Sequence, residues 1–222
     1  MTKIKQFFIN YKSTIDSVVI PDFGWEKVMT SEDALQWINP EKTMALHVNF
    51  FEKKPDLPSL KKIDGIRDFY RQQLAQNNGG LIQVDFTELE EHRAIQTIFK
   101  LPQEPSGMVY LASLTIPFHH CSYVIKIQAP EVGITGIRES AVANKLLYKG
   151  EITNGENGYE NWSADPYDDS FSEGTLMNKS EDAIYDADFA KHPLTKAREL
   201  ISQIAKEIQF KPEIKKLRRF SK

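Results

Sequence analysis

The sequence has little cysteine and no long apolar run. Its single cysteine, Cys121, cannot form an internal disulfide, which is usual for proteins of reducing compartments. Near the N-terminus the apolar run Phe7-Phe8-Ile9 ends at Asn10, whereas a signal peptide needs about 7–15 apolar residues. No other run approaches the roughly 18 apolar residues of a membrane-spanning helix. The sequence therefore predicts a soluble cytoplasmic protein that makes no membrane contact.

Signatures of catalysis and cofactor binding are also missing. There is no Gly-x-Ser-x-Gly nucleophile elbow, and the glycine pairs at 79–80 and 133–136 lack a Walker lysine or dinucleotide-binding spacing. His119 and His120 are adjacent, so on a regular strand they would point to opposite faces. Only His119 and Cys121 could then share a metal ion, and two ligands are too few for zinc. We therefore expect no enzyme activity, no cofactor and no metal site.

Charge is distributed unevenly, although the formal net charge is only −3. Residues 1–150 carry 17 acidic and 17 basic side chains, residues 151–189 carry 11 acidic and 1 basic, and residues 190–222 carry 3 acidic and 10 basic. A neutral body is thus followed by an acidic block and then by a basic block. Blocks of opposite sign can neutralise each other, so we expect the acidic side chains to face solvent or the basic C-terminal helix.

A period of two dominates residues 34–130 and predicts β-strands. In LIQVDFT this alternation groups Ile82 with Val84 and Phe86 on one face. The clearest case is TMALHVNFF, in which the alternate apolar residues are Met44, Leu46, Val48 and Phe50. Alternation between short turns favours antiparallel strands with one buried face, because the linkers are too short for parallel crossovers. We expect these strands to form a meander.

Three segments have helical spacing. The first covers 59–78, with Asp64 as a candidate N-cap and Asn or Gly of NNGG in the left-handed position at its end. The second covers 136–147, and the third begins at Pro193. Its apolar stripe needs a surface to cover, so we expect it to dock on the free face of the sheet. The stripe of this third helix consists of Ala197, Leu200, Ile201, Ile204, Ala205 and Ile208.

The predicted fold class is α+β, an antiparallel sheet flanked by helices.

The order of these segments resembles the PsbP-like superfamily, whose bacterial branch is DcrB-like. The resemblance covers roughly residues 14–148: IPDFGW at 20–25, a strand pair around Trp37 and ALHVNFF, a helix, the GGLIQVDFTEL…HRAIQTIF hairpin, and a long hairpin ending in VIKIQAP. It implies an α/β/α sandwich and a role in binding other proteins without catalysis. Members of the superfamily include an extrinsic photosystem subunit, a Ran-binding nucleotide-release factor and chaperones for secretion effectors.

The stretch ENWSADPYDDSF (160–171) crowds acidic and aromatic side chains after the Gly/Asn-rich break at 149–158. Its carboxylates lack the Asp-x-Asp-x-Asp-Gly order that directs ligands toward calcium. A buried aromatic anchor contributes roughly 1.5–3 kcal/mol, so a few could fasten this polar segment to the body. We favour fastening. The alternative is a binding surface for a partner, formed by Trp162, Asp165, Tyr167, Asp168, Asp169 and Phe171.

The chain is thus divided into a sheet domain (1–150), an acidic aromatic-rich irregular segment (151–192), and an amphipathic helix with a basic tail (193–222). We predict a non-enzymatic protein-binding module, such as an adaptor, chaperone or immunity-type protein, that binds a protein partner through a sheet face or groove or through residues 151–192. One alternative is a small hydrolase, which His47 or His119 beside a carboxylate in a pocket would indicate. A second is nucleic-acid binding through the basic tail, with Phe220 available for stacking. The oligomeric state is left open.

Overall fold

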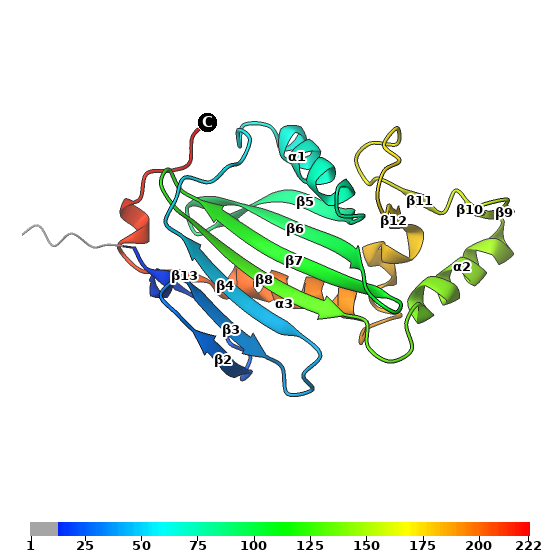
Figure 1. Ribbon diagram of the computed structural model, residues 1–222, viewed down its shortest axis with the longest axis horizontal. Helices are drawn as coiled ribbons and strands as arrows, with labels where there is room; N and C mark the ends of the chain where they lie inside the picture. The colour runs from blue at the N-terminus through cyan, green and yellow to red at the C-terminus, as the bar shows by residue number, and fades with distance from the viewer. Residues whose placement is uncertain (1–12) are drawn as a thin grey trace, which may run out of the picture.

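Seven antiparallel strands form the central sheet of the computed structural model, which describes residues 13–222 (Figure 1). The strands lie in the order β2-β3-β4-β8-β7-β6-β5. They are β2 (Glu26–Thr30), β3 (Ala34–Ile38), β4 (Ala45–Phe51), β5 (Gly80–Leu89), β6 (His92–Pro102), β7 (Met108–Pro117) and β8 (Ser122–Pro130). The helices are α1 (Ile63–Ala75), α2 (Ile137–Lys149) and α3 (Pro193–Glu207). The predicted α+β class is confirmed.

The sheet consists of two meanders joined side by side. Strands β2, β3 and β4 form one meander, and β5 to β8 form the other. The connection that contains α1 carries the chain from β4 to the far edge of the sheet, so that β8 returns to pair with β4 along Ala45–Phe51. Every strand pair is antiparallel, as predicted.

Helix α3 covers one face of the sheet by contacting β7 and β8 (Figure 1). The alternation predicted for β4 is confirmed, because Leu46, Val48 and Phe50 are buried in the core on this side. The helix begins at Pro193, and its stripe lies in the same core, as predicted. Burying an amphipathic stripe against an apolar sheet face is the main source of stability that a helix has in water.

Helix α1 lies on the opposite face, over β5. Here the prediction that Ile82 and Val84 share a face is wrong. The register shifts between Leu81 and Gln83, so an extra residue in β5 turns Ile82 into the α3-side core, while Val84 packs beneath α1. A β-bulge of this kind reverses the alternation locally, which a pattern of period two cannot reveal.

The ends of α1 differ in how well they were predicted. The helix begins at Ile63 with Lys62 as the N-cap residue, so Asp64 lies in the first turn and is not the cap. At the other end Asn78 has a φ of 52° and the amide of Gly79 donates to the Leu74 carbonyl, which confirms the left-handed ending at NNGG.

Residues 151–192 run beside the sheet between α2 and α3. They contain two short strand pairs, β9 (Thr153–Gly155) with β10 (Gly158–Glu160) and β11 (Ser163–Ala164) with β12 (Met177–Asn178). A further pair, β1 (Val18–Val19) with β13 (Gln209–Phe210), joins the two ends of the described chain. None of the helices in residues 13–222 is long and apolar enough to cross a membrane. The stretch through Asn10, which underlies the signal-peptide prediction, lies outside the described residues.

Gly80 permits a close crossing between β5 and the acidic segment. A Cβ atom built on Gly80 would clash with the carbonyl oxygen of Thr175, and the amide of Thr175 donates to the Gly79 carbonyl at 3.1 Å. We predict that Gly80→Ala lowers the free energy of unfolding by about 1–3 kcal/mol, because backbone must move to make room. Urea denaturation followed by tryptophan fluorescence measures this value.

The matched control is Gly65→Ala in α1, where a Cβ would meet no atom within 4 Å. Alanine is the better helix former, so this variant should raise the free energy of unfolding by up to about 1 kcal/mol. Equal stability of the Gly80→Ala variant and the unchanged protein would contradict the close crossing.

Candidate functional site

The α1 side of the sheet is only partly covered (Figure 1). Helix α1 contacts β5, and its Tyr70 reaches Phe99 of β6 and Thr115 of β7. None of the described helices covers β3, β4, β8 or the remainder of β7 on this side. The alternate residues of these four strands that stay out of the α3-side core are mostly half-exposed. We call this surface the open face. Its residues are Ala34, Gln36, Ile38, Ala45, His47, Asn49, Val109, Leu111, Ser113, Val124, Lys126 and Gln128.

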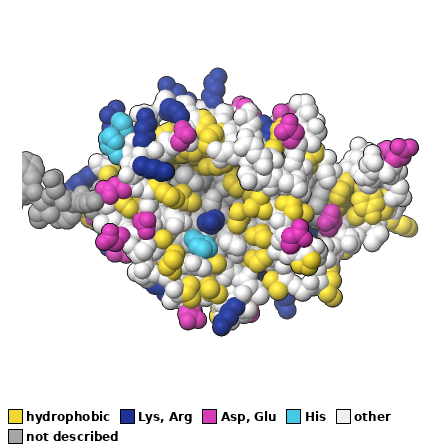
Figure 2. Space-filling model, in the orientation of Figure 1, with side chains coloured by type: hydrophobic (Ala, Val, Ile, Leu, Met, Phe, Trp, Pro, Cys, Tyr) yellow, Lys and Arg dark blue, Asp and Glu magenta, His cyan; other side chains and the backbone are white. Residues whose placement is uncertain are grey.

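A polar row crosses the middle of the open face. The strand register places Lys126 between His47 and Ser113, and Ser113 beside Thr97. The hydroxyl oxygens of Ser113 and Thr97 are 2.7 Å apart. Apolar residues flank this row, and Figure 2 shows a histidine and a basic side chain surrounded by hydrophobic ones in the middle of this surface. The open face therefore offers apolar contact area around a central polar row.

His47 and Lys126 are the ionisable residues of the polar row. The Nε2 atom of His47 is buried without a hydrogen-bond partner, and within residues 13–222 Lys126 makes no ion pair. Burial, and then the positive charge of Lys126, lower the pKa of His47. A hydrogen-bond acceptor that arrived from outside, such as a carboxylate, would pair with Lys126 and favour the protonated form of His47.

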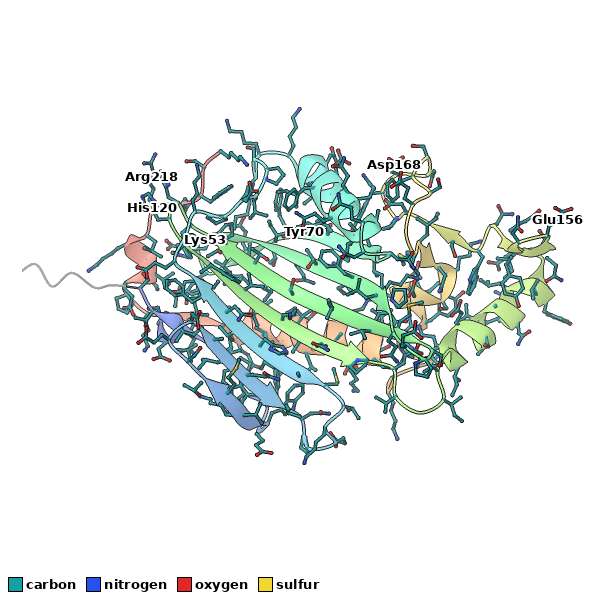
Figure 3. The ribbon with its side chains drawn as sticks, in the orientation of Figure 1. Lys53, Tyr70, His120, Glu156, Asp168 and Arg218 are labelled. Carbon is teal, nitrogen blue, oxygen red and sulfur yellow. The ribbon has the colours of Figure 1, made fainter. Side chains whose placement is uncertain are left out.

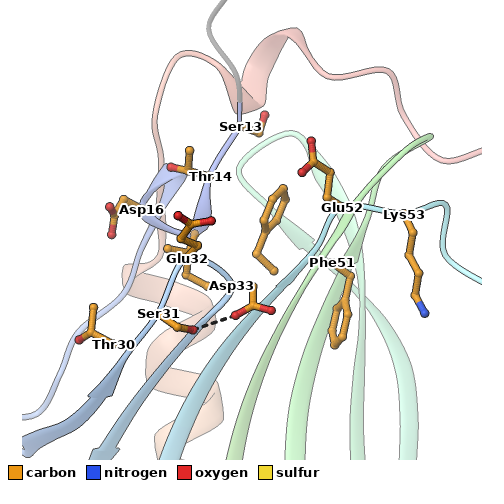
Figure 4. Close-up of a pocket in the computed structure, with 12 residues that line it drawn as sticks. Ser13, Thr14, Asp16, Thr30, Ser31, Glu32, Asp33, Phe51, Glu52 and Lys53 are labelled. Atoms are coloured by element: carbon orange, nitrogen blue, oxygen red, sulfur yellow. Dashed lines mark hydrogen bonds between the residues drawn. The ribbon is translucent and has the colours of Figure 1, made fainter.

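The pockets do not provide an acid/base pair at the histidines named above. Neither His47 nor His119 lines any of the main pockets within residues 13–222. One, of about 1100 Å³, lies at the end of the sheet beyond β4 (Figure 4). The turn between β2 and β3 contributes Ser31, whose hydroxyl donates to Asp33 at 2.8 Å. Within the described residues, no group of three or more His, Cys, Asp or Glu is placed to hold a metal ion.

His119 and His120 lie in the turn between β7 and β8, with their rings stacked at 4.3 Å. The amide of Phe118 donates to the Cys121 carbonyl and closes this turn. The thiol of Cys121 is buried, and burial raises its pKa to about 11. A thiol that is protonated at neutral pH is a poor nucleophile, so Cys121 is a packed residue of the turn.

The acidic-aromatic stretch is fastened to α1 by a buried ion pair. Asp165 accepts two hydrogen bonds from the guanidinium of Arg71, at 2.9 and 3.0 Å. The side chains of Arg71 and Asp165 are only 6% and 3% exposed. A planar guanidinium that meets a carboxylate through two parallel bonds fixes the orientation of both groups. Asp165 is therefore an internal anchor.

Tyr167 occupies the outer edge of β5. Its hydroxyl oxygen accepts the amide of Val84 at 2.9 Å, and the guanidinium of Arg67 lies 3.7 Å from the centre of its ring. Arg67 in turn donates to the Val84 carbonyl at 3.2 Å. Both outward backbone groups of Val84 are thereby satisfied by side chains, which blocks pairing of another strand at this position.

The other four candidate residues divide into two kinds. Trp162 is only 8% exposed and packs with Val142 and Leu146 of α2, so it too is an internal anchor. Phe171, Asp168 and Asp169 stay nearer the surface (Figure 3 labels Asp168). Hydrogen bonds from the side chain and the amide of Ser170 lower the pKa of Asp168. Binding of a partner by these residues stays a prediction.

A second buried ion pair fastens the later part of the acidic segment. The ammonium group of Lys100, on β6, lies 2.7 Å from a carboxylate oxygen of Glu181, and the two side chains are 2% and 1% exposed. Nearby, the guanidinium of Arg138, on α2, donates to the Ser180 carbonyl at 2.6 Å and to Asp186 at 3.0 Å. These contacts attach the segment to the sheet and to α2 together.

The expectation that the acidic side chains face solvent or the C-terminal helix is only partly right. Among the ion pairs within residues 13–222, only that between Asp186 and Arg198 joins the acidic block to α3. The buried partners instead come from the body, as Arg71, Lys100 and Arg138. Sequence reasoning missed these three. The signal was a lysine at 100 within an otherwise apolar run, which predicts a partner because a buried unpaired charge is very costly.

Comparison with known proteins identifies no family. No protein-family model matches the sequence, and no curated protein matches it. Solved structures of similar shape exist at low identity. A Bacteroides thetaiotaomicron structure is 13% identical with a TM-score of 0.34, and the match covers 55% of this chain but only 41% of that one.

Two further structures have a wider overlap. The Ran-binding protein Mog1p of Saccharomyces cerevisiae is 10% identical with a TM-score of 0.43, over 87% of this chain and 86% of that one. A Pseudomonas aeruginosa protein of unknown function, PA94, is 12% identical with a TM-score of 0.32, over 64% of this chain and 83% of that one. At such values these likenesses carry no argument about what this chain binds.

The pKa of His47 can be measured directly. We predict that NMR titration of its ring gives a value below the ordinary value of about 6.5. Lys126→Gln should raise this pKa without restoring it fully, because burial, the larger cause, remains. Because folding lowers this pKa, the unfolded chain binds the proton more readily than the folded chain. The free energy of unfolding should therefore decrease as the pH falls below about 6.5. A titration of His47 at or above the ordinary value would contradict this reading.

The anchoring role of Asp165 predicts a large loss of stability on substitution. Asp165→Asn removes the buried carboxylate that accepts two hydrogen bonds from Arg71 and leaves the guanidinium only its more exposed partner, Asp68, so the free energy of unfolding should fall by roughly 3–5 kcal/mol. Urea denaturation measures the loss, and limited proteolysis shows whether cleavage begins within 161–176. Asp169→Asn is the control, because Asp169 is exposed and its replacement should change stability by less than about 0.5 kcal/mol. Equal effects of the two substitutions would disprove the anchor.

Proposed function

We propose that this chain is a non-enzymatic protein-binding module of the cytoplasm and that its partner binds the open face. The observation that carries the proposal is the asymmetry of the sheet. One face is closed by α3, whereas the strands β3, β4, β8 and β7 present half-exposed apolar side chains on the other. A contiguous surface of this kind is typical of a site for another protein.

The side chains of the open face indicate the polarity and charge of the surface that would bind it. Leu111 and Val124 supply apolar contact on the two sides of the polar row, and Lys126 supplies a positive charge that forms no ion pair with any other residue of 13–222. A complementary surface would be apolar and would carry a carboxylate near its centre. Because the charge of Lys126 would lose its hydration on binding, such a carboxylate would determine specificity as well as register.

The acidic-aromatic stretch is the weaker of the two candidate surfaces. Trp162 and Asp165 are buried and Tyr167 is bound to the edge of β5, so the residues of this stretch that a partner could reach are Asp168, Asp169 and Phe171, which lie nearer the surface. Anchors that are buried internally cannot also serve as hot spots without releasing the segment. The resemblance to the PsbP-like superfamily and the adaptor or chaperone role stay predictions.

Site-specific photo-crosslinking tests the proposal with the full chain. A chain that ended at Lys149 would lack α3 and expose the core face of the sheet, so truncation cannot be used. A benzophenone side chain is placed at Gln128 on the open face or at Asp169 in the acidic-aromatic stretch. The control position is Ile134, which is 82% exposed and lies outside both surfaces. We predict an adduct with a partner protein in native lysate from position 128 and none from position 134.

A substitution provides the second arm of this experiment. Leu111→Glu should reduce the yield of that adduct by about tenfold, because it removes a central apolar contact, whereas Ile134→Glu should leave it unchanged. An adduct from position 169 that resists Leu111→Glu would move the binding site to the acidic-aromatic stretch. Absence of an adduct from position 128 would remove the open face as the site.

A further inference from the structure

A pocket of about 440 Å³ lies at the opposite end of α1 from the acidic segment. Its walls come from the residues before α1, the start of β6, the end of β7 and the last four residues of the chain. The C-terminal strip reaches it by pairing with the β7–β8 turn, where Arg219 bridges to Phe118 and the Arg218 carbonyl accepts the amide of His119. Basic side chains gather at this end of the molecule, where Figure 3 labels Arg218.

The charge of this pocket is predominantly positive. Lys61, Arg93, Arg219 and Lys222 line it, and Glu88 is the only carboxylate side chain among the lining residues. A concave surface lined by one sign of charge concentrates the field and attracts ions of the opposite sign. The floor is formed by the ring of His92, which packs against Phe118 at 5.2 Å and Phe210 at 5.3 Å.

Several hydrogen-bond donors in the pocket have no partner among residues 13–222. Arg93 donates from Nε to Glu88 and from one terminal nitrogen to the Leu60 carbonyl, which leaves its second terminal nitrogen. One terminal nitrogen of Arg219 donates to the Glu91 carbonyl. In residues 13–222 the ammonium group of Lys61 makes no ion pair. Guanidinium and ammonium groups that line one hollow suit the oxygens of a phosphate group.

The surroundings of the pocket favour a compact anion over a long polyanion. Lys222 lies 3.4 Å from Asp56, and Lys215 lies 3.1 Å from Glu90, so carboxylates border the basic side chains on both sides. A nucleic-acid strand would have to pass these carboxylates, whereas a single phosphate would not. Leu60, Pro117 and Phe220 provide apolar walls for the group that carries the phosphate.

We propose that this pocket binds a phosphorylated side chain of a protein. The phosphate would lie among Lys61, Arg93 and Arg219, and the residues next to it would contact Leu60 and Phe220. The inference does not rest on the open face, because none of the residues that line the pocket belongs to that face. Failure of one proposal therefore leaves the other intact.

The test is NMR titration of the full chain with a phosphoserine pentapeptide that has glycine on both sides. We expect saturable shifts of the backbone amides of His92, Arg93, Arg219 and Phe220, and no such shifts with the unphosphorylated peptide. Lys61→Gln combined with Arg219→Gln should weaken binding by about tenfold, because two charge-assisted donors are lost. Both side chains are exposed, so the double variant should fold.

Lys191→Gln combined with Lys206→Gln is the control, since it removes the same charge from exposed positions outside the pocket. Unchanged affinity of this control for the phosphopeptide would support binding in the pocket. An equal loss of affinity in both double variants would show that only the net charge of the protein matters, which would contradict the proposal. If inorganic phosphate bound as tightly as the peptide, the proposal that the ligand is a phosphorylated protein would be wrong. A thymidine dodecamer that binds more tightly, with an affinity that falls steeply with salt, would make the pocket a nucleic-acid site instead.

Discussion

The packing of α3 against the sheet is the interaction on which the rest of the structure depends. The strands at 34–130 are apolar on this face, and the helix that covers them comes more than sixty residues later in the chain. Residues 151–192 therefore have to lead from α2 back to the start of α3, and their buried contacts follow from that path. Because α3 covers one face, and α1 covers β5 and part of β6 on the other, that second face stays open over β3, β4, β8 and most of β7.

The acidic segment shows how a polar stretch can be held with few apolar residues. Two ion pairs, between Arg71 and Asp165 and between Lys100 and Glu181, are almost fully buried. Such pairs add little net stability, because desolvation offsets most of the attraction between the charges. Their effect lies in selectivity, since any other path of the segment would leave a buried charge without a partner. The ion pairs therefore determine where the segment lies. Its apolar contacts come from buried Ile152, Trp162 and Tyr185 and from partly buried Tyr167, Met177 and Phe189.

Local features of the fold could be predicted from the sequence, and features that depend on distant contacts could not. The alternation around Leu46 and the stripe around Ile201 gave the correct elements and the correct buried faces. The bulge at Ile82 and the pairing of β4 with β8 depend on neighbouring strands, so no local pattern contains them. For the candidate site, the prediction that aromatic side chains fasten the acidic segment to the body was correct, as Trp162 shows. The partners of Asp165 and Glu181 lie 94 and 81 residues away, and residue spacing carries no information at that range.

The distance in sequence between the sheet and α3 has a consequence during synthesis. The last long strand ends at Pro130, but α3 is complete only at Glu207. At about 5–20 residues per second, a ribosome needs roughly 4–15 seconds to make the intervening residues. For that time the apolar face of a nascent sheet has no helix to cover it, and this is the interval in which chaperones and aggregation compete for the chain. On the ribosome the sheet thus exposes both the face that α3 will cover and the open face, whereas the finished protein exposes only the open face.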